Sequence, residues 1–197
     1  MIIRDRDSLS LFMLRGKERM IKKLYPTHHV KSVFSINYKK LYDMGYRGIM
    51  FDIDATLVPH GQDITYNIEL LLDYIHQLGF KVLFLSNNSE DRISHFNRRV
   101  QLPYIALADK PNTIGYQKAL MKLNIPKEKV LMIGDQLMTD ILGANQSGID
   151  SILVDFLPQK GETKLGKKRC LELLLLRHYH RQKNAQNLGN IERGSYE

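Results

Sequence analysis

Short apolar runs alternate with segments of helical pattern along most of this chain, and this alternation restricts the fold more than any other feature. Five runs have the length and the apolar, β-favouring content of buried strands: residues 48–53, 81–86, 103–108, 129–134 and 151–156. Strands that alternate with helices form a parallel sheet with helices on both faces. We therefore predict an α/β fold of the three-layer, Rossmann-like kind, with a mainly parallel sheet of about five strands.

The segments between these runs carry the start and stop signals of helices. We expect helices at residues 36–45, 65–79, 89–100, 111–125 and 138–146. Ser89 is a suitable N-cap, and Gly79 is a suitable stop. Pro111 suits the first position of a helix, because an N–H group at that position would have no partner inside the helix.

Length and composition are those of one globular domain. The chain has 197 residues, of which 43% are hydrophobic and 25% are charged, so wholesale disorder is excluded. We expect a weakly ordered extension at residues 1–19, the domain with a basic C-terminal helix at 20–182, and a frayed polar tail at 183–197. The single Cys170 excludes an internal disulfide and suits a reducing, cytoplasmic location. The histidines at 28–29 lack zinc-site spacing, and we expect them to be solvated.

The net charge of +8 is concentrated at the two ends of the chain. Residues 1–31 carry eight Lys or Arg and three Asp or Glu, residues 160–197 carry nine and four, and residues 32–159 carry twelve and fourteen. The central domain is therefore not polycationic, which argues against a nucleic-acid partner for its folded face. Two basic ends suit an anionic partner, such as the inner face of the cell membrane. No stretch approaches the roughly 18–20 apolar residues that cross a bilayer.

A leucine run inside a basic segment, residues 165–183, supports two interpretations. As a helix, the segment places Leu171, Leu174 and Leu175 on one stripe. In one interpretation the stripe packs on the sheet, and in the other the segment meets a lipid surface. Both hold if long basic side chains reach lipid while the leucines face the core. The basic side chains in question are Lys167, Lys168, Arg169, Arg177 and Arg181.

Polar side chains stand where the expected strands end. Asp52 and Asp54 end the first strand on the same side, because strand side chains alternate, and Thr56 follows them. The other candidates come after later strands: Ser86 and Asn87, then Lys110, then Asp135 and Asp140. Taken alone, each piece also fits a polar strand end, a turn or a helix cap. Together they converge on one edge of the sheet, where ligands of such folds bind.

The chemistry of this group favours a magnesium ion and a phosphoryl group. Asp52, Asp54 and Asp135 repel one another unless a cation compensates them, and hard carboxylate oxygens suit Mg²⁺. With Ser86 and Lys110, such an ion makes a pocket for a dianionic phosphoryl group.

In order and spacing, these pieces resemble the four motifs of haloacid dehalogenase-like (HAD) phosphatases over residues 48–156. Those motifs are D-x-D-x-T at 52–56, a Ser or Thr after the second strand, a Lys, and G-D-x-x-x-x-D at 134–140. Many relatives carry Asn or Gly where this chain has Ala55. Many members also insert a cap domain near the first two motifs, but the segments here hold only single helices and one short strand. The resemblance therefore implies the capless subclass III.

The resemblance implies a Mg²⁺-dependent phosphomonoester hydrolase. Asp52 would be the nucleophile that forms an aspartyl-phosphate, and Asp54 would be the general acid and base. Asp52, the Asp54 backbone carbonyl and Asp135 would hold Mg²⁺, with support from Asp140. The remaining residues would bind the phosphoryl oxygens or orient the first loop: Ser86, Asn87, Lys110 and Thr56.

A finer resemblance is to the capless phosphatidylglycerophosphate phosphatase-like family of bacteria and mitochondria. It extends over residues 22–156 and is carried by "LYPTHHVKSVFSINYKKLYDMGYRGIMFDIDATLV" and "GDQLMTDILGAN". It implies an anionic phospholipid substrate, a role in phospholipid biosynthesis and a peripheral membrane position. Two alternatives stay open: a phosphatase of soluble, nucleic-acid or protein phosphomonoesters, and a phospho-receiver or anion-binding module without turnover. The D-x-D pair on one strand end favours an enzyme.

Overall fold

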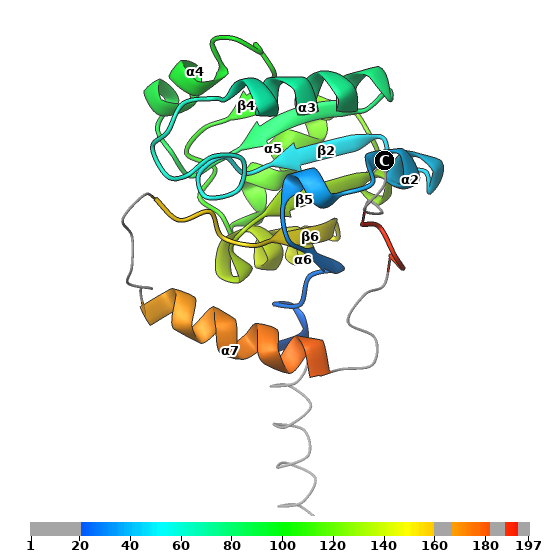
Figure 1. The fold of residues 1–197 in the computed structure, drawn as a ribbon, viewed down its shortest axis with the longest axis vertical. Coiled ribbons are helices and arrows are strands. Elements are labelled where there is room, and N and C mark those ends of the chain that lie inside the picture. Colours follow the sequence, from blue (N-terminus) through cyan, green and yellow to red (C-terminus); the bar gives the residue numbers. More distant parts are fainter. Residues whose placement is uncertain (1–20, 160–166, 182–187, 193–197) are drawn as a thin grey trace, which may run out of the picture.

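The sheet at the centre of the fold is parallel throughout. The computed structural model describes residues 21–159, 167–181 and 188–192, and its strands follow the order β1–β6–β5–β2–β3–β4 (Figure 1). Each neighbouring pair in that order is parallel. The predicted α/β class is therefore confirmed, with six strands in place of about five. The strands are β1 (His28–Val30), β2 (Gly48–Phe51), β3 (Lys81–Leu85), β4 (Tyr104–Ile105), β5 (Val130–Gly134) and β6 (Asp150–Val154).

The sixth strand is β1, which the sequence does not predict. Its three residues pair with β6, and His28 lies opposite Ile152. A run of three residues is too short for its periodicity to be recognised. His28 and Val30 are buried, whereas His29 between them is partly exposed. The prediction that His28 is solvated is therefore wrong, because its side chain points into the protein at the edge of the sheet.

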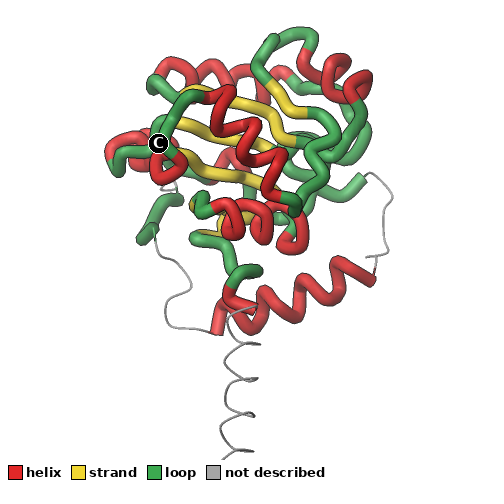
Figure 2. Tube along the Cα trace, turned by 180° about the vertical axis from the view of Figure 1, so that it is seen from behind, coloured by secondary structure: helices red, strands yellow, loops and turns green. Residues whose placement is uncertain are grey.

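Helices cover both faces of the sheet, as Figures 1 and 2 show. The short turn η1 and helices α2, α3 and α4 pack on the face that carries Ile49 and Phe51. Helices α5 and α6 pack on the opposite face, which carries Met50 and Met132. The bounds are η1 (Val33–Ser35), α2 (Tyr38–Asp43), α3 (Tyr66–Gln77), α4 (Glu90–Asn97), α5 (Thr113–Leu123), η2 (Lys127–Lys129), η3 (Leu137–Ile141), α6 (Leu142–Ser147) and α7 (Lys167–Arg181).

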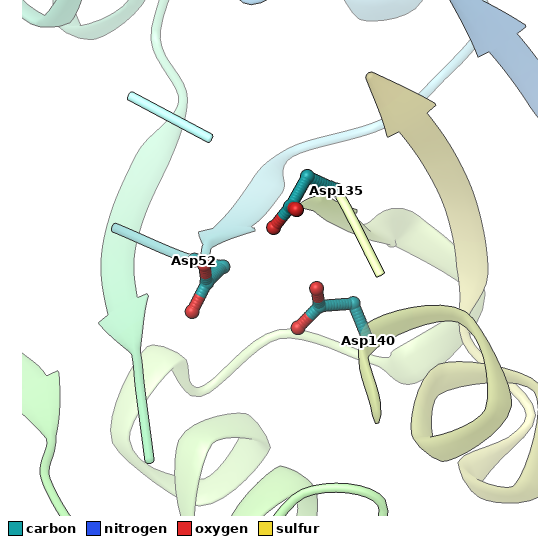
Figure 3. A group of neighbouring side chains, drawn as sticks. All are labelled: Asp52, Asp135 and Asp140. Carbon is teal, nitrogen blue, oxygen red and sulfur yellow. The ribbon is translucent and has the colours of Figure 1, made fainter. Parts of the chain in front are cut away.

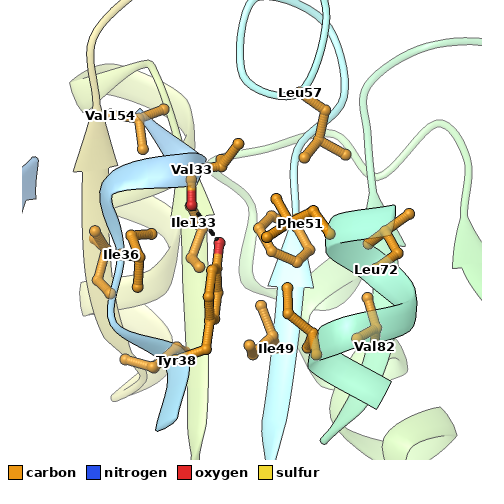
Figure 4. Packing of buried hydrophobic residues seen from close by; sticks show 14 of the residues in the cluster. Val33, Ile36, Tyr38, Ile49, Phe51, Leu57, Leu72, Val82, Ile133 and Val154 are labelled. Atoms are coloured by element: carbon orange, nitrogen blue, oxygen red, sulfur yellow. Dashed lines mark hydrogen bonds between the residues drawn. The ribbon is translucent and has the colours of Figure 1, made fainter. Parts of the chain in front are cut away.

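The larger apolar core lies between the sheet and the first group of helices (Figure 4). Tyr38 is fully buried in it, and its hydroxyl donates a hydrogen bond of 2.9 Å to the backbone oxygen of Val33. That bond satisfies a polar group which would otherwise be costly to bury. The core thus holds η1 and α2 against β2, the strand that ends at the first pair of carboxylates.

Three predicted elements begin or end differently in the structure. The strand expected at 103–108 is reduced to β4, because Leu107 and Asp109 have left-handed backbone angles, with φ of 46° and 54°. The helix expected from Pro111 begins at Thr113, because the Asn112 side chain caps it by accepting a hydrogen bond from the N–H of Ile114. The helix expected at 138–146 starts as η3, a π-helical turn, and continues as α6. Within residues 21–159, no cap domain is inserted.

Helix α7 packs on the core through part of its leucine run. Leu175 and Leu176 contact a small cluster formed by Leu137, Ile141 and Leu153. The other three leucines are exposed: Leu171 by 51%, Leu173 by 47% and Leu174 by 65%. The packing interpretation therefore applies to Leu175 and Leu176, and the contact with a lipid surface stays a prediction. No helix among the described residues is long and apolar enough to cross a membrane.

The segment at 188–192 differs from the frayed end that its polar composition predicts. Leu188 and Ile191 are buried in the larger core, and the Ile191 backbone oxygen accepts a hydrogen bond of 2.7 Å from the N–H of Asn37. These two apolar side chains account for the difference, because each removes apolar surface from water. The extension expected at 1–19 and the rest of the polar tail lie outside the described residues, so the predicted domain boundaries stay predictions.

Candidate active site

Three neighbouring strands bring the predicted residues to one edge of the sheet. Phe51 of β2 lies opposite both Phe84 of β3 and Ile133 of β5. The residues that follow, among them Asp52 and Asp135, therefore leave the sheet at the same level. The N–H of Asp52 still continues the ladder, donating a hydrogen bond of 2.9 Å to the oxygen of Ile133. Parallel pairing at this register explains why residues distant in sequence meet here.

Lys110 joins two of the carboxylates. Its ammonium nitrogen lies 2.6 Å from Asp52 Oδ1 and 2.6 Å from Asp140 Oδ1, and all three residues are buried. Burial raises the pKa of Asp52 to about 6, although the ammonium of Lys110 opposes the rise. Burial alone would lower the pKa of Lys110, but the carboxylates of Asp140 and Asp52 outweigh it and raise that pKa. Lys110 therefore stays charged and compensates part of the negative charge.

A third carboxylate completes a compact acidic group (Figure 3). One oxygen from each of Asp52, Asp135 and Asp140 lies within 4.8 Å of the others, and all three residues are buried. Burial, reinforced by the charge of Asp52, raises the pKa of Asp135 to about 6. The hydroxyl of Thr56 lies 3.3 Å from both Asp52 Oδ2 and Asp135 Oδ1, so it can donate to either carboxylate. Through these contacts Thr56 can position the carboxylates of Asp52 and Asp135.

The turn after β5 directs Asp140 back toward this group. A β-carbon added to Gly134 would lie 2.4 Å from Cγ of Asp140, so only glycine fits at this point of the G-D-x-x-x-x-D sequence. The N–H of Gln136 donates a hydrogen bond of 3.1 Å to Asp140 Oδ2. With Lys110 on its other oxygen, Asp140 is held on both sides. The π-helical turn η3 provides this geometry, in keeping with the frequent occurrence of such turns at functional sites.

Asp54 is held by several partners, among them Arg92, which sequence reasoning missed. Its Oδ1 accepts hydrogen bonds of 2.9 Å from the N–H of Gly61 and 2.8 Å from Arg92, while Oδ2 accepts one from the amide of Asn88. The imidazole of His60 lies 3.6 Å from Oδ2 and is 69% exposed at the pocket rim. Arg92 belongs to the first turn of α4, shortly after the predicted site residues Ser86 and Asn87, and this position was the only signal in the sequence.

Ser86 and Asn87 follow β3 and have different surroundings. Ser86 is buried, and its hydroxyl oxygen accepts a hydrogen bond of 3.3 Å from the N–H of Asn88. Asn87 is exposed, and its amide clamps the backbone of Lys110 with bonds of 2.7 and 3.1 Å. Asn87 therefore fixes the position from which Lys110 reaches the carboxylates.

A pocket of about 310 Å³ opens above these residues. The amide of Gln159 donates a hydrogen bond of 2.7 Å to the backbone oxygen of His60, which closes part of the rim. The pocket is lined by Asp52, Asp54, Ala55, His60, Ser86, Asn87, Asn88, Lys110, Gln136, Thr139, Asp140, Phe156 and Gln159. A larger groove of about 590 Å³ lies between α2 and α3, but it contains none of the predicted site residues. The smaller pocket is the one that the predicted site residues line.

Ala55 has a left-handed backbone, with φ of 63°. This region favours glycine and asparagine, the residues that many relatives of the resembled family carry there. The strained residue is held by two backbone hydrogen bonds, from its N–H to Val58 and from the N–H of Leu157 to its oxygen. The loop thus keeps its shape without the preferred residue.

Comparisons with known proteins show which sequences and structures this chain is similar to. A family model described as HAD-hydrolase-like matches residues 107–156. "Probable phosphatase YqeG" of Bacillus subtilis (strain 168) is 36% identical over 137 residues, which cover 68% of this chain and 80% of that protein. "Phosphatidylglycerophosphate phosphatase 1, chloroplastic" of Chlamydomonas reinhardtii is 23% identical over 137 residues, 64% of this chain. The chain spans about half of that relative, or 51%. An uncharacterized protein from Listeria monocytogenes serotype 4b aligns with a TM-score of 0.49 and 22% identity, over 66% of this chain and 99% of that one.

Proposed function

Because this chain belongs to the haloacid dehalogenase-like (HAD) superfamily and is a phosphatase of it, we propose that it hydrolyses phosphomonoesters through an aspartyl-phosphate on Asp52. The observation that carries this proposal is the contact of Lys110 with two buried carboxylates, beside a third, at the floor of an open pocket. A cation bound to paired carboxylates below a pocket suits the transfer of a dianionic group.

In the first step, an oxygen of Asp52 attacks phosphorus and the bond to the substrate oxygen breaks. Asp54 gives a proton to the leaving oxygen. In the second step, Asp54 takes a proton from water, whose oxygen attacks phosphorus and releases inorganic phosphate and free Asp52. Asp54 is placed for this role because it lines the pocket, where Arg92 and Gly61 hold it outside the acidic group.

The acidic group fits a magnesium ion. Three carboxylates against Lys110 leave a negative charge in a buried place, and one oxygen from each lies within 4.8 Å of the others. Asp52, Asp135 and the backbone carbonyl of Asp54 would hold the ion, with Asp140 in support. Such an ion supplies positive charge that stabilises the transferring phosphoryl group. Ser86 and Lys110 would bind phosphoryl oxygens, with Asn87 and Thr56 positioning Lys110 and the carboxylates.

For the substrate we propose an anionic phospholipid, phosphatidylglycerophosphate, at the inner face of the cell membrane. The pocket is covered by no cap domain within residues 21–159, so a phosphate on a large carrier can reach it. The Chlamydomonas relative is named for this substrate. The exposed Leu174 of α7, with Arg177 and Arg181 exposed on the same helix, suits contact with anionic lipid.

A second candidate is a phosphatase of soluble, protein or nucleic-acid phosphomonoesters. The polar rim of the pocket favours this candidate, because such a rim binds polar substrate groups as readily as a lipid headgroup. The rim includes His60, Gln136 and Gln159.

A phosphate-release panel separates these functions. The substrates are phosphatidylglycerophosphate in mixed micelles, small phosphomonoesters, nucleic acids with 3′- or 5′-phosphates, and phosphopeptides, each with wild type and with Asp52→Asn. We expect Mg²⁺-dependent release from phosphatidylglycerophosphate and none from the variant. Preference for a soluble substrate would establish the second candidate. If the protein became phosphorylated but released no phosphate, only a phospho-receiver or binding module would remain as its function.

A further inference from the structure

Arg169 contacts the acidic group of the candidate site although no sequence motif covers it. It belongs to the first turn of α7, outside both the motif region and the residues matched by the family model. Its guanidinium donates a hydrogen bond of 2.7 Å to the backbone oxygen of Asp135 and a second, ionic one to Asp135 Oδ2. The side chain of Asp135 is 0% exposed and that of Arg169 is 17% exposed. The residue expected to face lipid therefore faces the acidic group.

Two further contacts of this guanidinium, and one contact of its partner Glu172, fix its orientation. It donates a hydrogen bond of 3.1 Å to Glu172, one turn further along α7. Glu172 is itself buried and accepts a hydrogen bond of 3.1 Å from the N–H of Met138 in η3. The guanidinium carbon also lies 4.5 Å above the ring of Phe156, which lines the pocket. Because its partners come from three segments, Arg169 is held in place independently of any ligand.

We propose that Arg169 is a positioning residue of the metal site, which orients Asp135 for the divalent cation and makes α7 part of the catalytic structure. The inference rests on the proposed function, because it assigns the residue to the metal site of that phosphatase.

The two oxygens of Asp135 are used differently. Arg169 binds Oδ2, whereas Oδ1 lies by the hydroxyl of Thr56. An arginine offers several donors in a rigid fork, so it can fix both the carboxylate and the backbone oxygen of one residue. Partners that bind the outer oxygen of a metal ligand orient it, and their loss commonly weakens metal affinity by about 10–100-fold. The opposite idea, that Arg169 competes with the cation, predicts tighter metal binding when the residue is removed.

The test measures Mg²⁺ affinity of the full chain by isothermal titration calorimetry, together with the rise in melting temperature that Mg²⁺ causes. Arg169→Gln should weaken Mg²⁺ binding by about 10–100-fold. Arg169→Lys should recover part of the loss, because an ammonium can bind the carboxylate but cannot span both oxygens. Arg99→Gln is the matched control: it removes an arginine–carboxylate pair with Glu69, 2.9 Å long and away from the site, and should leave the affinity unchanged.

Affinity of Arg169→Gln within twofold of wild type would make the residue structural only, and tighter binding would make it a competitor. If that variant does not fold, as judged by circular dichroism, Arg169→Lys and Glu172→Gln decide, and wild-type affinity in both would contradict the role. Failure of the proposed function can be told apart from failure of this inference. If the proposed function is wrong, wild type does not hydrolyse phosphomonoesters. If only this inference is wrong, wild type hydrolyses them and the Arg169 variants bind Mg²⁺ as wild type does. A wild type that binds no Mg²⁺ would overturn both.

Discussion

Replacing Lys110 by methionine should destabilise the metal-free protein strongly. The lysine side chain is 2% exposed and binds Asp52 and Asp140, whose side chains are 10% and 1% exposed, at 2.6 Å each. Methionine keeps much of the volume but leaves both carboxylates without their cation. Removing one partner of a buried ion pair costs about 3–5 kcal/mol. For a domain of this size, 1 kcal/mol corresponds to about 2–4 °C, so the melting temperature should fall by about 6–20 °C.

The loss of stability caused by Lys110→Met should also depend on pH and on Mg²⁺. Without Lys110 the carboxyl pKa values rise further above their unfolded value, so the native state binds more protons than the unfolded state and gains stability as the pH falls. The difference between Lys110→Met and wild type should therefore be largest near pH 7.5 and smaller near pH 5. Magnesium should restore part of it at neutral pH, because the cation replaces the missing charge.

Differential scanning fluorimetry in chelator and in Mg²⁺ measures these effects. The control is Lys39→Met, which removes an exposed pair with Asp43, 2.8 Å long, and should leave the melting temperature unchanged. A Lys110→Met protein that melts within 2 °C of wild type in chelator at pH 7.5 would refute the reasoning, because the carboxylates would then need no buried cation.

Three further predictions concern the metal, the acid–base group and the membrane. Because burial raises the pKa of Asp52 and of Asp135 to about 6, protons compete with Mg²⁺ for both carboxylates. The Mg²⁺ affinity measured by calorimetry should therefore fall by about tenfold per carboxylate from pH 7 to pH 5. An affinity that does not change with pH would argue against these ligands. Asp54→Asn should slow phosphate release by about 10²–10⁴-fold in rapid-quench kinetics while a phosphorylated protein still forms; near-normal release would assign the proton transfer elsewhere. Wild type should sediment with anionic liposomes at low salt and be released from them at high salt. Because each basic residue contributes about 1 kcal/mol to binding, a quadruple Gln variant that keeps Arg169 should bind the liposomes roughly a thousandfold more weakly. Unchanged sedimentation of that variant would make α7 purely structural. That variant replaces Lys167, Lys168, Arg177 and Arg181.

The residues at the strand ends could be predicted because their signal is local. Asp52 and Asp135 each follow an apolar run, and parallel pairing brings the ends of such runs together. Lys110 could be placed by its position before a helix, although Asn112 rather than Pro111 determines where that helix begins. What these residues share is a short distance along the chain from a recognisable element.

The residues that support the site could not be predicted in the same way. Arg92 and Arg169 lie on helices, where an arginine normally faces solvent, and only the packing of α4 and α7 turns them inward. In sequence, Arg169 is one of several basic residues beside a leucine run. Similarly, β1 is recognisable only through its pairing with β6. Each of these features depends on contacts between segments far apart in the chain.

The most direct test of the central claim is the detection of the phosphorylated intermediate. Wild-type protein is mixed with phosphatidylglycerophosphate and Mg²⁺, quenched in acid within the first turnover, digested and examined by mass spectrometry. The account predicts one phosphoryl group on Asp52, removed by hydroxylamine as an acyl phosphate is, and none in Asp52→Asn. Turnover by purified Asp52→Asn, or a phosphoryl group on a different residue of wild type, would contradict the account.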